Sequence, residues 1–97
     1  MNYPVKWLPE AETTYELIIA YLDENWSQKQ VNTFIDRTDE VINFISQNPR
    51  QYAYSNKKGI FRAVVTSQIS LYYQIKSEEV ELLIFWDTRQ YPNKLKI

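Results

Sequence analysis

The chain has 97 residues, of which 44% are hydrophobic and 15% aromatic, and its net charge at pH 7 is −1. This length and composition predict one globular domain over residues 1–97 and exclude a disordered chain. Because the chain has no cysteine and no histidine, disulfides and the usual thiolate or imidazole metal sites are excluded, and we expect neither a metal ion nor a cofactor. No apolar run approaches the roughly 20 residues that cross a bilayer and no signal peptide is evident, so we expect a cytoplasmic protein without a membrane partner.

The first predicted elements are a short strand and a helix. Apolar residues alternate over positions 3–8, which is typical of a strand, and Pro4 lies near its start, where the missing backbone donor matters least. Pro9 fits the first position of a helix because its φ angle is already helical. We expect this helix to span residues 9–25. Its apolar stripe recurs every three or four residues and consists of Ala11, Tyr15, Ile18, Ile19, Leu22 and Trp26.

A second helix is predicted almost at once after the first. Ser27 and Gln30 have the spacing of a capping box, in which each side chain bonds the backbone of the other residue. The connection is therefore short, which indicates an antiparallel helical hairpin. Asn48 should end the helix because Pro49 disfavours the helical region for the residue before it. The apolar stripe, which we expect to cover a sheet, consists of Val31, Phe34, Ile35, Thr38, Val41, Ile42 and Ile45.

The longest irregular stretch spans residues 50–59 and holds the only glycine, Gly59. Lys57 and Lys58 are adjacent within it. Neighbouring lysines are suited to contact phosphate, and they are also typical of a soluble turn. The residues alone leave both interpretations open.

Three strands should follow, over residues 60–65, 69–75 and 80–86. Their short polar connections predict an antiparallel meander. Six of the seven residues in the last strand are apolar, which indicates a strand covered on both faces and placed inside the sheet. We therefore predict an α+β fold in the order β-α-α-β-β-β, with a helical hairpin packed on a small, mainly antiparallel sheet.

Two arginines in this meander are candidate site residues. Arg62 lies in the middle of a strand, where a charge is costly unless it is paired or exposed. It either pairs across strands with Glu81 or Asp87, or it is a cation held on an exposed face of the sheet. Arg89 follows the last strand in a polar rim.

Charge is distributed unevenly along the chain. Residues 1–48 carry three basic and eight acidic residues, a net charge of −5, whereas residues 49–97 carry eight basic and four acidic residues, a net charge of +4. This division can place opposite potentials on two faces of the molecule. Ordinary charges on helix surfaces give the same pattern.

Three segments together resemble the RelE/ParE toxin superfamily of bacterial type II toxin–antitoxin systems. They are residues 61–65, 71–75 and 83–92. The likeness consists of an arginine in the first meander strand, a tyrosine pair in the second, and an arginine followed by a proline after the third. The order and spacing of these short motifs extend the resemblance over essentially the whole chain.

The resemblance implies a toxin that a cognate antitoxin neutralises. RelE-like members cut messenger RNA on the ribosome without a metal, and ParE-like members poison DNA gyrase; both targets stay open. In the nuclease branch, the resemblance implies catalytic roles for Arg62, Arg89 and Tyr91. It also implies nucleic-acid contacts from Lys57 and Lys58. An exposed Tyr72 would stack on a base. The alternative is a non-enzymatic protein-interaction module on a toxin fold whose catalytic set has decayed.

Overall fold

The computed structural model describes residues 2–55 and 59–89. Its elements confirm the predicted α+β class and the order β-α-α-β-β-β. Among the described residues, no helix has the length and apolar character to cross a membrane. The elements are β1 (Val5–Trp7), α1 (Pro9–Asn25), α2 (Gln28–Gln47), β2 (Ile60–Thr66), β3 (Ile69–Lys76) and β4 (Glu79–Asp87).

The four strands form one mixed sheet in the order β1-β4-β3-β2. β1 runs parallel to β4, and the other neighbours are antiparallel. β4 therefore lies inside the sheet, as its continuous apolar sequence predicts. The turn between β3 and β4 holds only two residues, Ser77 and Glu78, with φ angles of 53° and 61°. Positive φ at both positions gives a backbone twist that matches that of the flanking strands.

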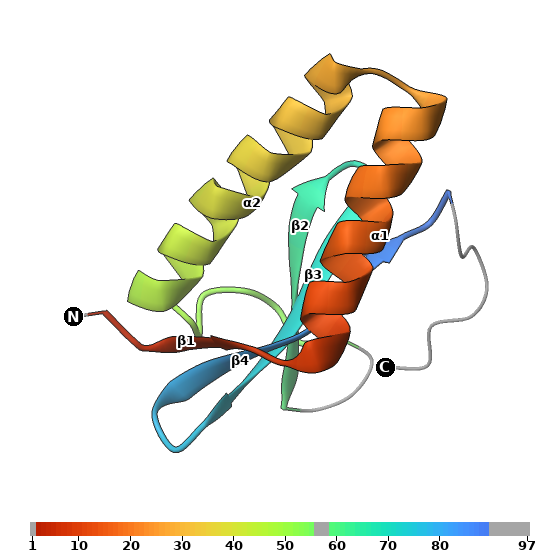
Figure 1. The fold of residues 1–97 in the computed structure, drawn as a ribbon. Coiled ribbons are helices and arrows are strands. Elements are labelled where there is room, and N and C mark those ends of the chain that lie inside the picture. Colours follow the sequence, from red (N-terminus) through yellow and green to blue (C-terminus); the bar gives the residue numbers. More distant parts are fainter. Residues whose placement is uncertain (1, 56–58, 90–97) are drawn as a thin grey trace.

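Both helices lie on one face of the sheet (Figure 1). α1 packs against β4, and α2 packs against β2. Aromatic side chains join the layers: Phe85 of β4 lies 5.2 Å from Tyr15 of α1 and 6.1 Å from Phe34 of α2, measured between ring centroids. The hydrophobic core thus lies between the helical hairpin and the sheet. The predicted apolar stripe of α2 is confirmed, because its apolar residues pack into this core from the helix side.

α2 begins and ends where its capping residues predict. Ser27 Oγ accepts a hydrogen bond from the backbone N–H of Gln30 at 3.3 Å. Asn48 is the C-terminal cap of α2. The prediction that Trp26 belongs to the buried stripe of α1 is wrong, since its side chain is 55% exposed. The reason is that α1 ends at Asn25, so Trp26 follows the helix in a non-helical backbone conformation.

Thr14 is a core residue of α1 that the apolar pattern does not identify. Its hydroxyl donates to the carbonyl of Glu10 at 2.8 Å and accepts the backbone N–H of Phe85 at 2.9 Å. β1 pairs with β4 only as far as Leu82, so beyond that point a helix side chain satisfies the backbone of β4. A buried threonine in this position links the helix directly to the strand.

Replacing Phe34 with alanine should lower the free energy of unfolding by about 3–5 kcal/mol, because Phe34 is 1% exposed and its loss leaves a cavity beside Phe85. Chemical denaturation of the purified protein measures this change. Leu17→Ala is the control, since Leu17 lies on α1 but is 46% exposed. Equal, small effects of both substitutions would show that the buried side of the hairpin is assigned incorrectly.

Tyr73→Phe should cost about 1–3 kcal/mol at neutral pH, because the Tyr73 hydroxyl donates to the Pro49 carbonyl at 2.6 Å and the side chain is fully buried. Burial, and to a lesser extent Tyr52, raises the pKa of Tyr73 well above its ordinary value. The folded state therefore holds this proton more tightly than the unfolded state. The resulting stability is complete below about pH 10 and is lost as the pH rises further.

Denaturation between neutral and strongly alkaline pH tests both statements about Tyr73. Tyr54→Phe is the control, since Tyr54 is 56% exposed. The stability of the unmodified protein should decline at alkaline pH, and the stability of the Tyr73→Phe variant should decline less. Identical pH profiles for the Tyr73 variant and the unmodified protein would contradict the assignment.

Candidate functional site

Arg62 projects from the face of β2 that is turned away from the helices. Its neighbours Phe61 and Ala63 are buried in the core, and side chains alternate along a strand, so Arg62 points to the opposite face, where it is exposed. Its Nε donates to the Ser70 hydroxyl at 3.1 Å. Tyr72 of β3 is its register partner.

The predicted pairing of Arg62 with Glu81 or Asp87 is not found in the part of the chain that the structure describes. Glu81 instead accepts from Gln74 Nε2 at 2.7 Å. Asp87 binds Arg89. Of the two interpretations of Arg62, a cation held on an exposed face of the sheet fits the structure.

Tyr72 is only 7% exposed, so the expectation of an exposed tyrosine is wrong. Its position explains the burial: β3 lies between β2 and β4, and Arg62 and Ile84 flank Tyr72 in the ladder. In this conformation the ring offers little surface for a base to stack on. A contact between Tyr72 and nucleic acid therefore stays a prediction.

Arg89 forms a bidentate ion pair with Asp87. Its Nε lies 3.1 Å from one carboxylate oxygen and its Nη2 lies 3.3 Å from the other, while its backbone N–H donates to Oδ1 at 2.9 Å. The Asp87 side chain is fully buried, and that of Arg89 is 23% exposed. Two parallel hydrogen bonds fix the guanidinium in one orientation and offset its charge.

Two aromatic rings of the helical hairpin hold the other side of Arg89. The guanidinium carbon lies 5.5 Å from the ring centroid of Trp26 and 5.9 Å from that of Tyr21. Such contacts attract a cation to the ring face. Arg89 therefore joins the end of β4 to the end of α1 on the helix side of the sheet.

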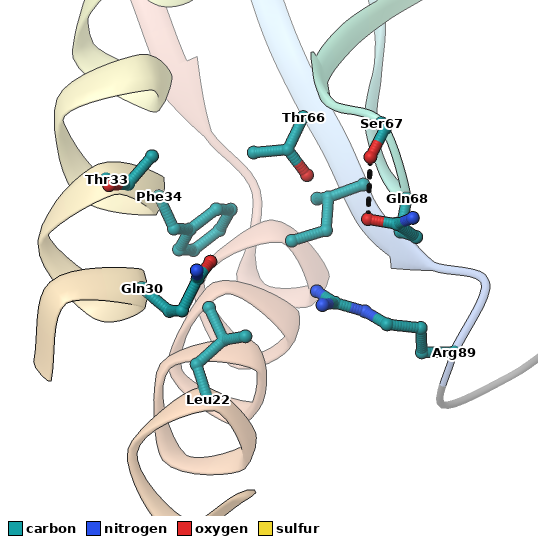
Figure 2. Close-up of a pocket in the computed structure, with 9 residues that line it drawn as sticks. Leu22, Gln30, Thr33, Phe34, Thr66, Ser67, Gln68 and Arg89 are labelled. Carbon is teal, nitrogen blue, oxygen red and sulfur yellow. Dashed lines mark hydrogen bonds between the residues drawn. The ribbon is translucent and has the colours of Figure 1, made fainter. Parts of the chain in front are cut away.

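A pocket of about 130 Å³ opens beside Arg89, between the hairpin and the turn that joins β2 to β3 (Figure 2). Leu22 and Phe34 contribute apolar surface on the helix side. Amides, hydroxyls and the guanidinium supply the polar surface, from Gln30, Thr33, Thr66, Ser67, Gln68 and Arg89. Since Asp87 offsets the charge of Arg89, this pocket suits a neutral side chain better than a phosphate.

The structure brings together only part of the predicted site. Arg62 and Tyr72 are neighbours, whereas Arg89 lies on the other side of the sheet and beyond its end. Lys57, Lys58 and Tyr91 lie outside the described residues. Within residues 2–55 and 59–89, no group of three or more carboxylates could hold a metal ion.

Sequence reasoning did not identify the partners of Arg89. The sequence analysis assigns Asp87 only as a possible partner of Arg62, although the spacing of Asp87 and Arg89 is itself a signal. An aspartate at an inward position of a buried strand needs a cation, and an arginine two residues later, past the strand end, can fold back to it. Trp26 gave no comparable signal, because its helical spacing also fits a core residue.

Comparisons with known proteins bear on this fold and site. A sequence profile described as the ParE toxin of type II toxin–antitoxin system, parDE, matches residues 5–92. The search of curated proteins found no match.

Solved structures with the same fold include toxins from three organisms. One belongs to the chromosomal ParDE toxin–antitoxin system of P. aeruginosa, with 16% identity, a TM-score of 0.74 and coverage of 88% of this chain and 95% of that one. The YoeB dimer of S. aureus has 14% identity, a TM-score of 0.62 and coverage of 89% and 97%. The E. coli DinJ–YafQ toxin–antitoxin complex has 8% identity, a TM-score of 0.63 and coverage of 94% and 98%.

These structural likenesses, at such low identity, establish the shared fold. The profile match adds the family, because it spans nearly all of the chain. It also agrees with the resemblance seen in residues 61–65, 71–75 and 83–92. The chain therefore belongs to the ParE toxin family of type II toxin–antitoxin systems.

Proposed function

We propose that this protein inhibits bacterial growth by binding and poisoning DNA gyrase, and that a cognate antitoxin neutralises it. Membership of the ParE family supports this target over the ribosome, since the ParE-like branch of the superfamily poisons gyrase. The proposed activity depends on binding a protein target. It needs no acid–base pair in the toxin.

The separation of Arg62 from Arg89 is the observation that carries the choice. Cleavage of RNA by its own 2′-hydroxyl needs a base, an acid and cations gathered around one phosphate. Arg62 projects from the outer face of the sheet, while Arg89 is bound to Asp87 beneath the helical hairpin. In this arrangement the two guanidinium groups cannot converge on one phosphate, which supports binding over cleavage.

The charge and composition of the chain support the same choice. Affinity for nucleic acid depends on concentrated positive charge, and this chain has a net charge of −1 with an acidic helical hairpin. Without histidine, proton transfer near neutral pH would require a tyrosine or lysine with a strongly lowered pKa, or a carboxyl group with a raised one. Three of the described tyrosines have a shifted pKa, namely Tyr15, Tyr52 and Tyr73. In each of them burial is the main cause, and it raises the pKa.

An antitoxin partner follows from the family and from the structural relatives. The E. coli relative is a DinJ–YafQ complex, and an S. aureus relative is a YoeB–YefM complex. By similarity, we propose that this toxin also binds a protein encoded beside it.

Induction of the protein in growing bacteria, without a neighbouring gene product, tests the proposed target. We expect growth arrest with altered DNA supercoiling and intact messenger RNA. Mapping of message ends and of supercoiling from one culture measures both. The Arg62→Ala variant should still arrest growth, since Arg62 has no catalytic role in this proposal.

Two outcomes of the induction experiment would overturn the proposal. New message ends within translated codons that disappear in Arg62→Ala would identify a ribosome-dependent nuclease instead, with Arg62, Arg89 and Tyr91 as its candidate residues. Normal growth with neither signal would favour the non-enzymatic interaction module.

Replacing Arg89 with alanine should destabilise the fold by about 3–5 kcal/mol, because it leaves the fully buried carboxylate of Asp87 without its cation. Denaturation of the purified variant measures this. Arg50→Ala is the control: Arg50 is 58% exposed and its ion pair with Glu78 lies at the surface, so we expect a change below about 1 kcal/mol. Unchanged stability of Arg89→Ala would show that the ion pair with Arg89 does not stabilise the buried carboxylate of Asp87.

A further inference from the structure

A second cavity, of about 410 Å³, lies where β1 runs into the N-terminal half of α1. Among the residues that the structure describes, Trp7, Glu12, Tyr15 and Glu16 line it. It is separate from the Arg62 face and from the pocket beside Arg89, which adjoins the C-terminal half of α1. This lining combines aromatic rings with carboxylates.

The aromatic wall of this cavity is rigid. Trp7 and Tyr15 meet edge to face with ring centroids 5.1 Å apart. Phe85 supports both rings from the core, at 5.6 Å from Trp7 and 5.2 Å from Tyr15. Both rings remain partly exposed, so they offer aromatic surface to a ligand without rearrangement. Aromatic faces attract cations such as ammonium and guanidinium groups.

The carboxylates of Glu12 and Glu16 provide the negative charge. They are exposed and lie one helical turn apart on α1, so both reach the same side of the helix. Among the described residues, neither takes part in an ion pair. Two carboxylates at this spacing repel each other, and a cation placed between them would relieve the repulsion.

The outer edge of β1 lies directly beside the cavity. The Pro4 carbonyl and the Leu8 N–H bond to β4. Because backbone groups alternate in direction along a strand, the backbone groups of Val5 and Trp7 face away from β4. No strand in the described part of the chain pairs with this edge. An extended segment of another protein can therefore lie next to Trp7 and direct one side chain into the cavity.

We propose that this cavity binds a lysine or arginine side chain from an extended segment of the antitoxin. The aromatic rings and the two glutamates match the chemistry of such a side chain, and the acidic N-terminal half of the chain, with a net charge of −5 over residues 1–48, attracts a basic segment. The inference rests on the proposed antitoxin partner. It makes Glu12 and Glu16 determinants of neutralisation, not of toxicity.

The test compares two double variants of equal charge in binding to the protein encoded next to the toxin gene. Glu12→Gln with Glu16→Gln removes the carboxylates of the cavity. Asp23→Asn with Glu24→Gln removes two exposed carboxylates at the other end of α1. Calorimetry at low and high salt measures the affinity of each variant for the partner. We expect the Glu12/Glu16 variant to lose at least tenfold in affinity and to show a weaker salt dependence. The affinity of the Asp23/Glu24 variant should change less than twofold.

A double-mutant cycle identifies the partner's side chain. Replacing the inserted lysine or arginine of the partner with glutamine should weaken binding to the unmodified toxin but cause no further loss in the Glu12/Glu16 variant. Equal losses in both charge variants, or additive losses for every basic residue of the partner, would overturn the proposal. Self-association of the toxin that the Glu12/Glu16 variant abolishes would also overturn it, by making a second copy of the chain the occupant.

Different experimental outcomes would contradict the proposed function and this inference. Absence of any complex with the neighbouring gene product would overturn both the antitoxin partner and the cavity's assignment. A tight complex that the Glu12/Glu16 variant leaves unchanged would overturn the cavity's assignment alone. The induction experiment with the unmodified toxin is separate, and it tests only the proposed gyrase target.

Discussion

The burial of β4 is the constraint on which the rest of this structure depends. β4 pairs with strands on both sides, and α1 covers the face on which Phe85 meets Trp7, Tyr15 and Phe34. Beyond the end of β1, the Thr14 hydroxyl accepts a hydrogen bond from the backbone N–H of Phe85. A strand enclosed in this way has a fixed position and register, so each side chain before and after it is placed by the core.

The same constraint decides where the arginines lie. The inward residues of β4 are Val80 and Leu82 before a β-bulge and Phe85 and Asp87 after it. The bulge therefore directs Asp87 under the hairpin, where Arg89 neutralises its fully buried carboxylate. Arg62 occupies an outward position of β2 and points to the other face. The alternation of β2 and the bulge of β4 therefore separate two cations that the sequence analysis assigns to one site.

The sequence predicted the fold well because its strongest signals are local. Pro9 and Ser27 set the starts of the helices, Asn48 before Pro49 sets the end of α2, and the apolar run of residues 80–86 identifies an interior strand. These features act within a few residues, so no knowledge of distant contacts is needed. The structure reproduces the predicted span of α1, Pro9–Asn25, at both ends.

The candidate site was harder to predict because it depends on contacts between distant segments. Tyr72 has the alternation of an outward residue, yet it is buried between Arg62 and Ile84 on the adjacent strands. Trp26 continues the helical spacing but lies beyond the end of α1, where it stacks on Arg89. Neither burial nor such stacking can be deduced from spacing along one element, since each depends on side chains from other elements.

The distribution of polar groups favours recognition of protein over chemistry on RNA. Arg89 is bound to Asp87 and to aromatic rings, and Arg62 is bonded to a serine hydroxyl, so both cations are held in place by their own neighbours. Glu12 and Glu16, by contrast, lie exposed beside the rigid rings of Trp7 and Tyr15. Rigid aromatic residues next to charge are typical of the centres of protein interfaces. In this toxin the groups best prepared to meet a partner therefore lie on α1 and β1, away from Arg62 and Arg89.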